Sequence, residues 1–359
     1  MGRRGVIINL LEYSSLKTGG VTMNSIPNIF SEEISQDFFV LSTNGTSIAY
    51  FPLRGKAFVI KSEKGVGLLR EYFQHGASNL EMESFLNKNS FLKDPPRNPT
   101  RKRSEYHPTE LVLSLTSDCN LACSYCYASA GETHNTIPWE IIEKAIKITV
   151  AESQKLGKKS FKLLFHGGGE ASVKWNLVER STELVKNLWE EKNSFSIVTN
   201  ATLINSRKAK WLQENSFHVS VSLDGPKDVH DLQRPKKNGE GSFEDCINGI
   251  LCLKEANVSF GIRTTICNSN IDRIKELIMI AKTFDCGLKI EPLIVTGRAN
   301  DTDSISFERF YEKILDAKNF AKRLGVNLKS TYFHGLKHRT DFCSGNGNLF
   351  CVLPDGQIS

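Results

Sequence analysis

Long apolar runs are missing from this sequence, and no stretch approaches the roughly 20 residues that a membrane-spanning helix needs. The apolar residues 6–11 follow two arginines, but they are too few for the core of a secretory signal. A strong excess of one charge is also missing, because 46 basic and 40 acidic residues leave a formal net charge of +6. We therefore expect a cytoplasmic protein whose partners are neither a membrane nor a nucleic acid.

A Gly-x-Gly-x-x-Gly run after a strand is absent too, which argues against an oxidoreductase that binds a dinucleotide. Cysteine, in contrast, is plentiful, with nine residues in the chain. Disulfides are rare in a reducing compartment, so we expect some of these cysteines to bind metal or to act in catalysis.

Prolines between residues 95 and 108 divide the chain into two regions. Before them, short strand-like runs are broken by turn residues and followed by two helical patterns, which predicts a small α+β module over residues 1–94. The expected strands are 38–42, 47–52 and 57–61, and the expected helical segments are 66–73 and 82–86. The prolines and nearby basic residues indicate a solvated linker over residues 95–109.

After the linker, apolar runs alternate with amphipathic helical patterns six times. The expected strands are 111–115, 161–165, 195–198, 218–223, 259–266 and 288–295. The expected helices are 139–151, 177–189, 206–213, 243–256, 271–284 and 307–324. Such alternation predicts a parallel sheet, open or closed, with functional residues at the carboxyl ends of its strands. We assign residues 110–300 to this core and residues 301–342 to a helical bridge.

Three cysteines follow the first strand of this core with the spacing Cys-x3-Cys-x2-Cys, namely Cys119, Cys123 and Cys126. Thiolates hold the irons of a [4Fe–4S] cluster, and a cluster closed by the protein needs four of them. Three thiolates on one loop leave one iron free to bind another molecule. The spacing therefore indicates a cluster with one open iron.

Two other interpretations of these cysteines stay open. A structural zinc site needs a fourth Cys or His ligand, for which His134 is the nearby candidate. A thioredoxin-like pair at Cys123 and Cys126 leaves Cys119 without a role.

Four later cysteines form no spaced ligand set, and we expect them to be core residues. They are Cys246, Cys252, Cys267 and Cys286.

The cysteine loop resembles that of the radical S-adenosylmethionine (SAM) superfamily, and the resemblance extends over residues 110–299. An aromatic residue, Tyr125, precedes the last cysteine, and the run Gly-Gly-Gly-Glu at 167–170 resembles the family's glycine–glycine–glutamate motif. The run Thr-Asn-Ala-Thr-Leu at 199–203 resembles a Thr-Asn-Gly-Thr-Leu motif. Ala201 replaces the glycine, so a positive φ at this position strains the turn.

The residues Ser-Val-Ser-Leu-Asp-Gly-Pro at 220–226 resemble the subgroup that matures peptides and sulfatases. His230, Asp231 and Arg234 belong to the same pattern. Two interpretations of these three side chains stay open: a functional set, or a loop that is paired with itself.

The resemblance implies a partial (β/α)6 radical SAM barrel, preceded by the small α+β domain and followed by a cysteine-bearing extension. It implies that Cys119, Cys123 and Cys126 hold a core [4Fe–4S] cluster, which reductively cleaves bound SAM. It also implies that Glu170 accepts a hydrogen bond from the SAM ammonium group, with glycines before it to let the backbone approach. The implied SAM contacts are Tyr125, Gly168, Gly169, Glu170, Asn200, Ser222 and Arg263.

Residues 343–359 resemble the opening of the cysteine-rich SPASM extension, in which the first cysteine ligates an auxiliary iron–sulfur cluster. Cys343 is thus a candidate ligand, whereas Cys351 takes a position that is usually small and apolar. A plain hairpin around Asp355 is the alternative. Because the sequence stops at Ser359, before the next cysteine of that pattern, we expect this extension to be incomplete.

We therefore predict a radical SAM enzyme that modifies a precursor peptide, with an anaerobic sulfatase-maturating enzyme as the alternative. Outside this class, a zinc- or nucleotide-binding oxidoreductase and a non-catalytic peptide-binding protein are the other candidates. The expected partners are a precursor peptide or a sulfatase and an electron donor such as flavodoxin or ferredoxin. The N-terminal module resembles leader-recognition domains, which add a peptide as a strand at a sheet edge, although a dimerisation or lid domain is an alternative.

Overall fold

The computed structural model describes residues 11–12, 30–35, 38–43, 46–51, 56–60, 63–76, 79–92, 106–331 and 348–358. The chain divides into two compact units, each of which is described by itself. The smaller unit comprises residues 1–102 and 334–342, and the larger one comprises residues 103–333 and 343–359.

The smaller unit contains a five-stranded antiparallel sheet with the strand order β1-β5-β4-β3-β2. Its strands are β1 (Leu11–Glu12), β2 (Phe30–Ser35), β3 (Phe38–Thr43), β4 (Thr46–Phe51) and β5 (Lys56–Ile60). Two helices follow, α1 (Glu63–His75) and α2 (Leu80–Lys88). The alternating pattern predicted β3, β4 and β5, but it missed β1 and β2.

Aromatic rings fill the core of the smaller unit. Phe51 packs against Phe38, Phe58 and Phe91, with ring centroids 4.8 to 6.2 Å apart. All four rings are fully buried or nearly so, and Leu69 of α1 is buried with them. Burial of this much aromatic surface explains how so small a sheet has a core of its own.

The larger unit contains an eight-stranded, entirely parallel sheet with the order β12-β11-β10-β9-β8-β7-β6-β13. Six strands match the predicted runs: β6 (Glu110–Leu113), β7 (Ser160–Phe165), β8 (Lys192–Thr199), β9 (His218–Ser222), β10 (Ser259–Ile266) and β11 (Gly287–Pro292). Two further strands were not predicted, β12 (Leu328–Lys329) and β13 (Leu349–Val352).

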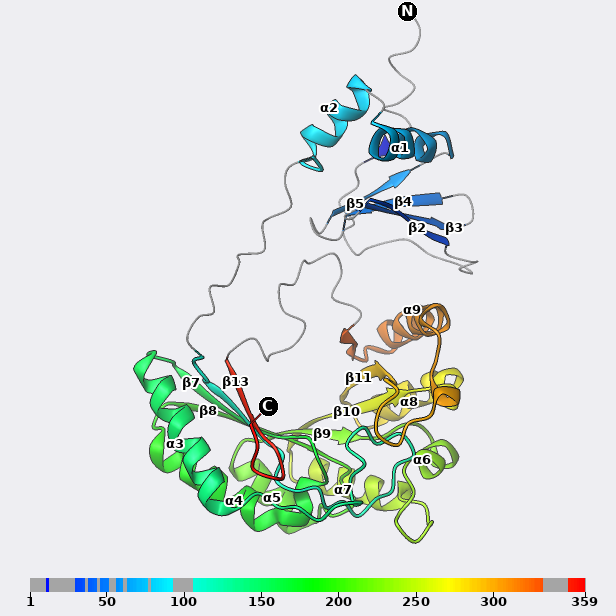
Figure 1. Cartoon of the computed structure of the whole chain (residues 1–359). Coiled ribbons are helices and arrows are strands. Elements are labelled where there is room, and N and C mark those ends of the chain that lie inside the picture. Colours follow the sequence, from blue (N-terminus) through cyan, green and yellow to red (C-terminus); the bar gives the residue numbers. More distant parts are fainter. Residues whose placement is uncertain are drawn as a thin grey trace, which may run out of the picture. The chain divides into compact units, whose positions relative to one another are not determined.

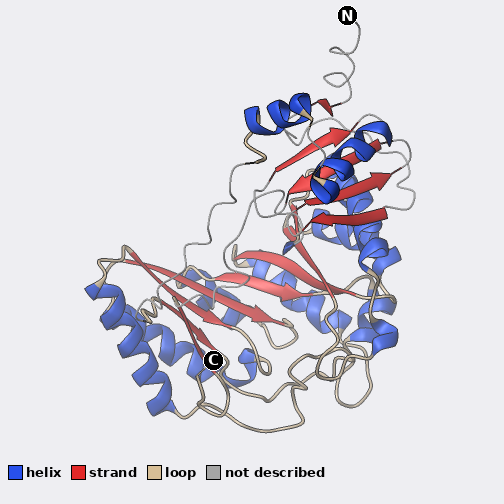
Figure 2. Ribbon diagram, turned by 45° about the horizontal axis from the view of Figure 1, so that its top comes forward, coloured by secondary structure: helices blue, strands red, loops and turns tan. Residues whose placement is uncertain are grey.

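Helices cover the outer side of this sheet (Figures 1 and 2). They are α3 (Trp139–Lys155), α4 (Trp175–Leu188), α5 (Ser206–Glu214), α6 (Lys227–Gln233), α7 (Phe243–Glu255), α8 (Ile274–Thr283) and α9 (Phe307–Leu324). Every second strand residue, such as Phe161, Leu163 and Phe165 of β7, is buried in the apolar core shared with these helices. The residues that alternate with them, such as Lys162 and Leu164, lie on the opposite face, which is the inner face of the sheet.

The fold class is the predicted α/β class with a parallel sheet, and this sheet is wider than the six strands expected. The residues after α9 provide β12 at one edge, and the C-terminal residues provide β13 at the other. Four pairs join β13 to β6, from Leu349 opposite Glu110 to Val352 opposite Leu113. Among the described residues, no helix is long and apolar enough to cross a membrane.

Candidate active site

The loop that carries the three cysteines lies between β6 and α3. Thr116 pairs with Thr136 across the base of this loop, and Ser117 N–H donates to the Asn135 carbonyl at 2.9 Å. Each cysteine sulfur receives one hydrogen bond. Leu121 N–H donates to Cys119 at 3.5 Å, Ala130 N–H donates to Cys126 at 3.4 Å, and the Arg234 guanidinium donates to Cys123 at 3.8 Å.

The chemistry of the three thiols fits a cluster. Burial, with smaller contributions from nearby Glu170, Cys123 and Cys126, raises the pKa of Cys119 to about 12, so an ionised thiolate at this position requires a bound cation. Among the described residues, no group of three or more His, Cys, Asp or Glu lies close enough to hold a single metal ion. Ligands of a [4Fe–4S] cluster bind separate irons and therefore stand farther apart.

The glycines after β7 lie directly against the cysteine loop. Gly169 N–H donates to the Thr116 carbonyl at 2.6 Å, and Glu170 N–H donates to the Asp118 carbonyl at 2.8 Å. A Cβ atom on Gly169 would lie 1.9 Å from the Asp118 carbonyl oxygen, and one on Gly168 would lie 2.5 Å from the Ser114 hydroxyl. The close approach that these glycines allow is thus an approach of the cysteine loop itself, which the sequence reasoning did not foresee.

The Glu170 carboxylate joins this loop to the next strand. It is buried, and it accepts hydrogen bonds from Thr199 Oγ1 at 2.7 Å and Asn200 N–H at 2.7 Å at the end of β8. It also accepts from Ser172 N–H at 3.0 Å. A carboxylate has about four acceptor positions, so three bonds leave room for one more donor.

Asn200 fixes the turn after β8 to the cysteine loop. Its amide donates to Asn120 Oδ1 at 2.9 Å, and Asn120 donates back to Thr202 Oγ1 at 2.7 Å. Ala201 lies between them with φ +61°, so the position does require the left-handed conformation. This strain costs about 1 kcal/mol and is outweighed by the contacts around it.

Ser222 and Arg263 lie opposite each other in the parallel register of β9 and β10. The charge of Arg263 contributes to the lowered pKa of His166, which falls to about 4 mainly because of burial. It also opposes the rise in the pKa of Tyr127 that burial causes. Arg263 therefore lies on the inner side of the sheet, near the residues that follow the last cysteine.

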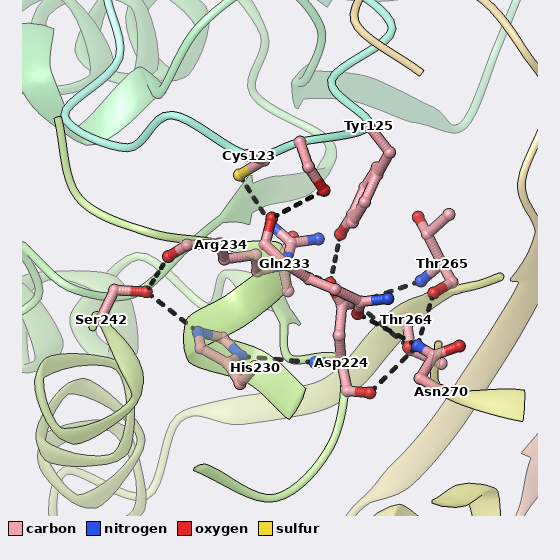
Figure 3. A network of polar contacts seen from close by, with 12 residues as sticks. Cys123, Tyr125, Asp224, His230, Gln233, Arg234, Ser242, Thr264, Thr265 and Asn270 are labelled. Carbon is pink, nitrogen blue, oxygen red and sulfur yellow. Dashed lines mark hydrogen bonds and ion pairs between the residues drawn. The ribbon is translucent and has the colours of Figure 1, made fainter. Parts of the chain in front are cut away.

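Asp224 is the centre of a buried polar network (Figure 3). It is fully buried, and it accepts hydrogen bonds from Arg234 Nε at 2.7 Å, Thr264 Oγ1 at 3.1 Å and Thr265 N–H at 3.2 Å. The Tyr125 hydroxyl donates to the same carboxylate. The side chain of Tyr125 is thus committed to this network, and burial raises its pKa well above the usual value.

Two of the three side chains of this motif, His230 and Asp231, are paired within the segment around them. His230 Nδ1 accepts from Asp224 N–H at 3.4 Å, and its Nε2 lies 3.1 Å from the Ser242 hydroxyl. Asp231 accepts from Phe243 N–H at 2.7 Å. Arg234 differs from these two, because it also reaches a cysteine sulfur.

Arg298 was not singled out from the sequence, although it contacts the cysteine loop. Its Nε donates to the Cys123 carbonyl at 3.1 Å, and its NH1 donates to the Ala130 carbonyl at 3.2 Å. Residues 297–298 lie so close to the loop that a Cβ atom on Gly297 would be 2.3 Å from the Cys126 carbonyl oxygen. The sequence signal that could have pointed to Arg298 was the family resemblance, because it extends to residue 299.

His134, the candidate fourth zinc ligand, is mostly exposed and bonds to Asp118 at 2.5 Å. Lys174 holds the other oxygen of Asp118 at 3.0 Å. Cys246 and Cys267 are buried core residues, whereas Cys252 and Cys286 are partly exposed at the edge of the core. Cys343 lies outside the described residues.

A cavity of about 680 Å³ opens beside the cysteine loop, on the inner side of β6, β7, β8 and β13. Its walls include the side chains of Ser114, Tyr127, His166 and Cys351. The Ser114 hydroxyl is buried and has no hydrogen-bond partner within the described residues. The cavity therefore reaches the loop of the three cysteines, and its walls are more apolar than polar.

Residues 113–281 match the model of the radical SAM superfamily. A cysteine-type anaerobic sulfatase-maturating enzyme of Clostridium perfringens is 30% identical over 273 residues, which are 69% of this chain and 72% of that protein. The sporulation killing factor maturation protein SkfB of Bacillus subtilis is 30% identical over 280 residues, 75% of this chain and 63% of its own length. This chain belongs to the radical SAM superfamily, and it is a radical SAM enzyme of a family that uses a [4Fe–4S] cluster and SAM.

Among solved structures, Streptococcus suis SuiB bound to its precursor peptide SuiA superposes with a TM-score of 0.56. It is 14% identical in sequence, and the match covers 90% of this chain and 82% of SuiB, so this likeness concerns the fold alone. The chain spans 44 to 72% of the length of eight curated relatives with similar sequences.

We expect Gly169→Ala to damage the site by separating the cysteine loop from β7. The added methyl group meets a backbone carbonyl that cannot move aside, which costs about 3 kcal/mol. Iron bound after anaerobic reconstitution should fall strongly, and thermal unfolding should shift to lower temperature. Gly287→Ala is the matched control, because a Cβ atom there has an ordinary contact distance of 3.6 Å. Normal iron content in Gly169→Ala would contradict the packing described here.

We also expect His230 to make stability depend on pH. Its pKa is lowered from 6.5 to about 4, chiefly by burial, so the unfolded chain binds a proton that the folded chain refuses between these values. The free energy of unfolding therefore falls as the pH drops from 6.5 to 4, by about 3 kcal/mol for this group. His166 adds a similar contribution.

Urea unfolding of the metal-free protein at pH 7 and pH 4.5 tests this expectation. His230→Asn should lose part of the pH dependence. An unchanged dependence in His230→Asn would show that folding does not shift the pKa of this ring.

Proposed function

We propose that this enzyme modifies a peptide or protein substrate by radical chemistry that starts from SAM. The observation that carries the proposal is the 30% identity to SkfB over 75% of this chain, since SkfB is named for the maturation of a killing factor. The cavity beside the cysteine loop supports it, because it offers a side chain of the substrate a path to the site.

We assign the cluster to Cys119, Cys123 and Cys126, and the methionine part of SAM to the groups around Glu170. Cluster and SAM together supply a 5′-deoxyadenosyl radical once an electron has been delivered. The unused acceptor position of Glu170 suits the ammonium group. Ser222 and Arg263, side by side on the inner face, suit the carboxylate, and Asn200 holds the turn between them.

The glycines and Tyr125 support the site through the cysteine loop and not through side-chain contacts with SAM. Gly168 and Gly169 keep the cysteine loop against β7, as their close contacts require. Because the Tyr125 hydroxyl is bound to Asp224, only the main chain of Tyr125 is left for a contact with SAM. The residues of the chain thus orient the cofactors and shield them from side reactions.

The smaller unit is our candidate for substrate recognition. Its sheet has β2 at one edge and the two-residue β1 at the other, where Leu11 and Glu12 pair with Ile60 and Val59. A precursor peptide that adds a strand at such an edge gains main-chain hydrogen bonds. We further propose that a flavodoxin or ferredoxin delivers the electron.

A second function is supported by the relative from Clostridium perfringens. Its name describes maturation of a sulfatase cysteine, and it is as similar to this chain as SkfB is. The two functions differ in their substrate. One acts on a leader-bearing precursor peptide and the other on a folded or nascent sulfatase, but both use the same site.

Mass spectrometry of peptides incubated with reconstituted enzyme, SAM and a reductant tests the proposed function. We expect a mass change on a precursor peptide together with 5′-deoxyadenosine, and loss of peptide affinity when residues 1–102 are removed. A change confined to a sulfatase-derived peptide would support the second function. 5′-Deoxyadenosine formation without a change in either peptide would contradict both.

Replacement of Glu170 tests the placement of SAM. We expect Glu170→Gln to weaken SAM binding by about 1.5–3 kcal/mol, because one hydrogen bond to a charged group is lost. Thr199→Val is the control: it removes one bond to the same carboxylate and the bond that Thr199 Oγ1 accepts from Ala201 N–H, and it should cost about 2 kcal/mol of stability while SAM affinity stays unchanged. Anaerobic calorimetry measures the affinity. Parent-like binding in Glu170→Gln with its cluster intact would place SAM elsewhere.

A further inference from the structure

Arg234 is brought to Cys123 by the backbone, before any side chain is considered. Ala122 N–H donates to the Pro235 carbonyl at 2.8 Å, and Ser124 N–H donates to the Gln233 carbonyl at 3.0 Å. Leu121 and Lys236 form an antiparallel bridge next to them. The cysteine loop and the segment after α6 therefore run antiparallel, in a register that places Arg234 directly opposite Cys123.

The side chain of Arg234 completes this approach. Its NH1 donates to the Cys123 sulfur at 3.8 Å, while its Nε donates to the buried Asp224 at 2.7 Å (Figure 3). The guanidinium also lies 5.3 Å from the centre of the Tyr125 ring. Asp224 is itself held by Thr264 and Thr265, so the guanidinium has little freedom to turn away from the sulfur.

The other two cysteine sulfurs receive only neutral backbone donors, from Leu121 and Ala130. The donor at Cys123 is a cation that stays charged under all ordinary conditions. Reduction adds an electron to a cluster and so increases its negative charge. A fixed cation and hydrogen-bond donor at a ligand sulfur stabilises the reduced form and raises the reduction potential.

We propose that Arg234 is a positioning residue that sets the reduction potential of the core cluster through Cys123, and that Asp224 holds it there. The proposal rests on the cluster assignment alone and not on the peptide substrate. The alternative is that Arg234 only neutralises Asp224 and fastens the loop. These two roles predict different potentials for variants that keep the fold.

The experiment is a redox titration of the reconstituted cluster without SAM, followed by electron paramagnetic resonance. Asp224→Asn removes a negative charge and leaves Arg234 uncompensated, so the potential should rise. The double variant Arg234→Gln with Asp224→Asn is a neutral pair of similar shape, and its potential should fall below that of the parent. We expect the double variant to differ from Asp224→Asn by at least tenfold in the ratio of reduced to oxidised cluster, about 59 mV for one electron.

Lys174→Gln is the matched control, because it removes one positive charge next to the cysteine loop without a bond to sulfur. Its potential should equal that of the parent. If Asp224→Asn and the double variant also titrate with the parent while iron content is normal, the proposal is wrong and Arg234 is a structural residue.

A measurement on the parent protein tests the proposal even if the variants do not bind iron. Protein labelled with ¹⁵N-arginine should show a nitrogen coupling to the reduced cluster in pulsed resonance spectra, and Arg298→Lys should retain it. Absence of any arginine coupling in the labelled parent would overturn the proposal without recourse to the variants.

Discussion

The contact between the cysteine loop and the two glycines after β7 is the constraint on which the site depends. Three thiols on a flexible loop do not define a site until other parts of the chain hold the loop in one position. Here the carbonyls of Thr116 and Asp118 attach the loop by accepting from the backbone of residues 169–170. Glu170 then extends the attachment to β8, where Thr199 and Asn200 donate to its carboxylate. Two strands and one loop are thereby fixed by a few buried hydrogen bonds in a low-dielectric setting.

A second attachment comes from the segments that follow β9, β10 and β11, further along the sheet. The segment after α6 runs along the loop, and Asp224 draws Arg234, Tyr125 and β10 into one network. Arg298 adds two bonds to loop carbonyls from the residues after β11. The loop is thus held from β7, β9, β10 and β11 together. That arrangement gives an irregular segment of the chain the fixed geometry that a metal site needs and that rigid elements usually supply.

The sequence was sufficient for the parts of the fold that depend on periodicity. Six apolar runs that alternate with amphipathic helical patterns predicted the parallel sheet, and the cysteine spacing predicted the cluster site. The edge strands β12 and β13 escaped because two and four residues are too short to show a pattern. The contacts of Arg234 and Arg298 escaped for another reason: they depend on which segments fold against the loop, and local sequence does not encode this. Ala201 is an intermediate case. The sequence predicted the turn at this position, but only the structure shows its φ of +61°.

The central claim is that three cysteines on a braced loop hold a [4Fe–4S] cluster with one open iron that SAM occupies. Mössbauer spectroscopy of protein reconstituted with ⁵⁷Fe, recorded with and without SAM, tests it most directly. The account predicts four irons per chain in a three-to-one ratio, with only the single iron changing its signal when SAM binds. Four equivalent irons that ignore SAM, or a site that takes up zinc in place of iron, would contradict it.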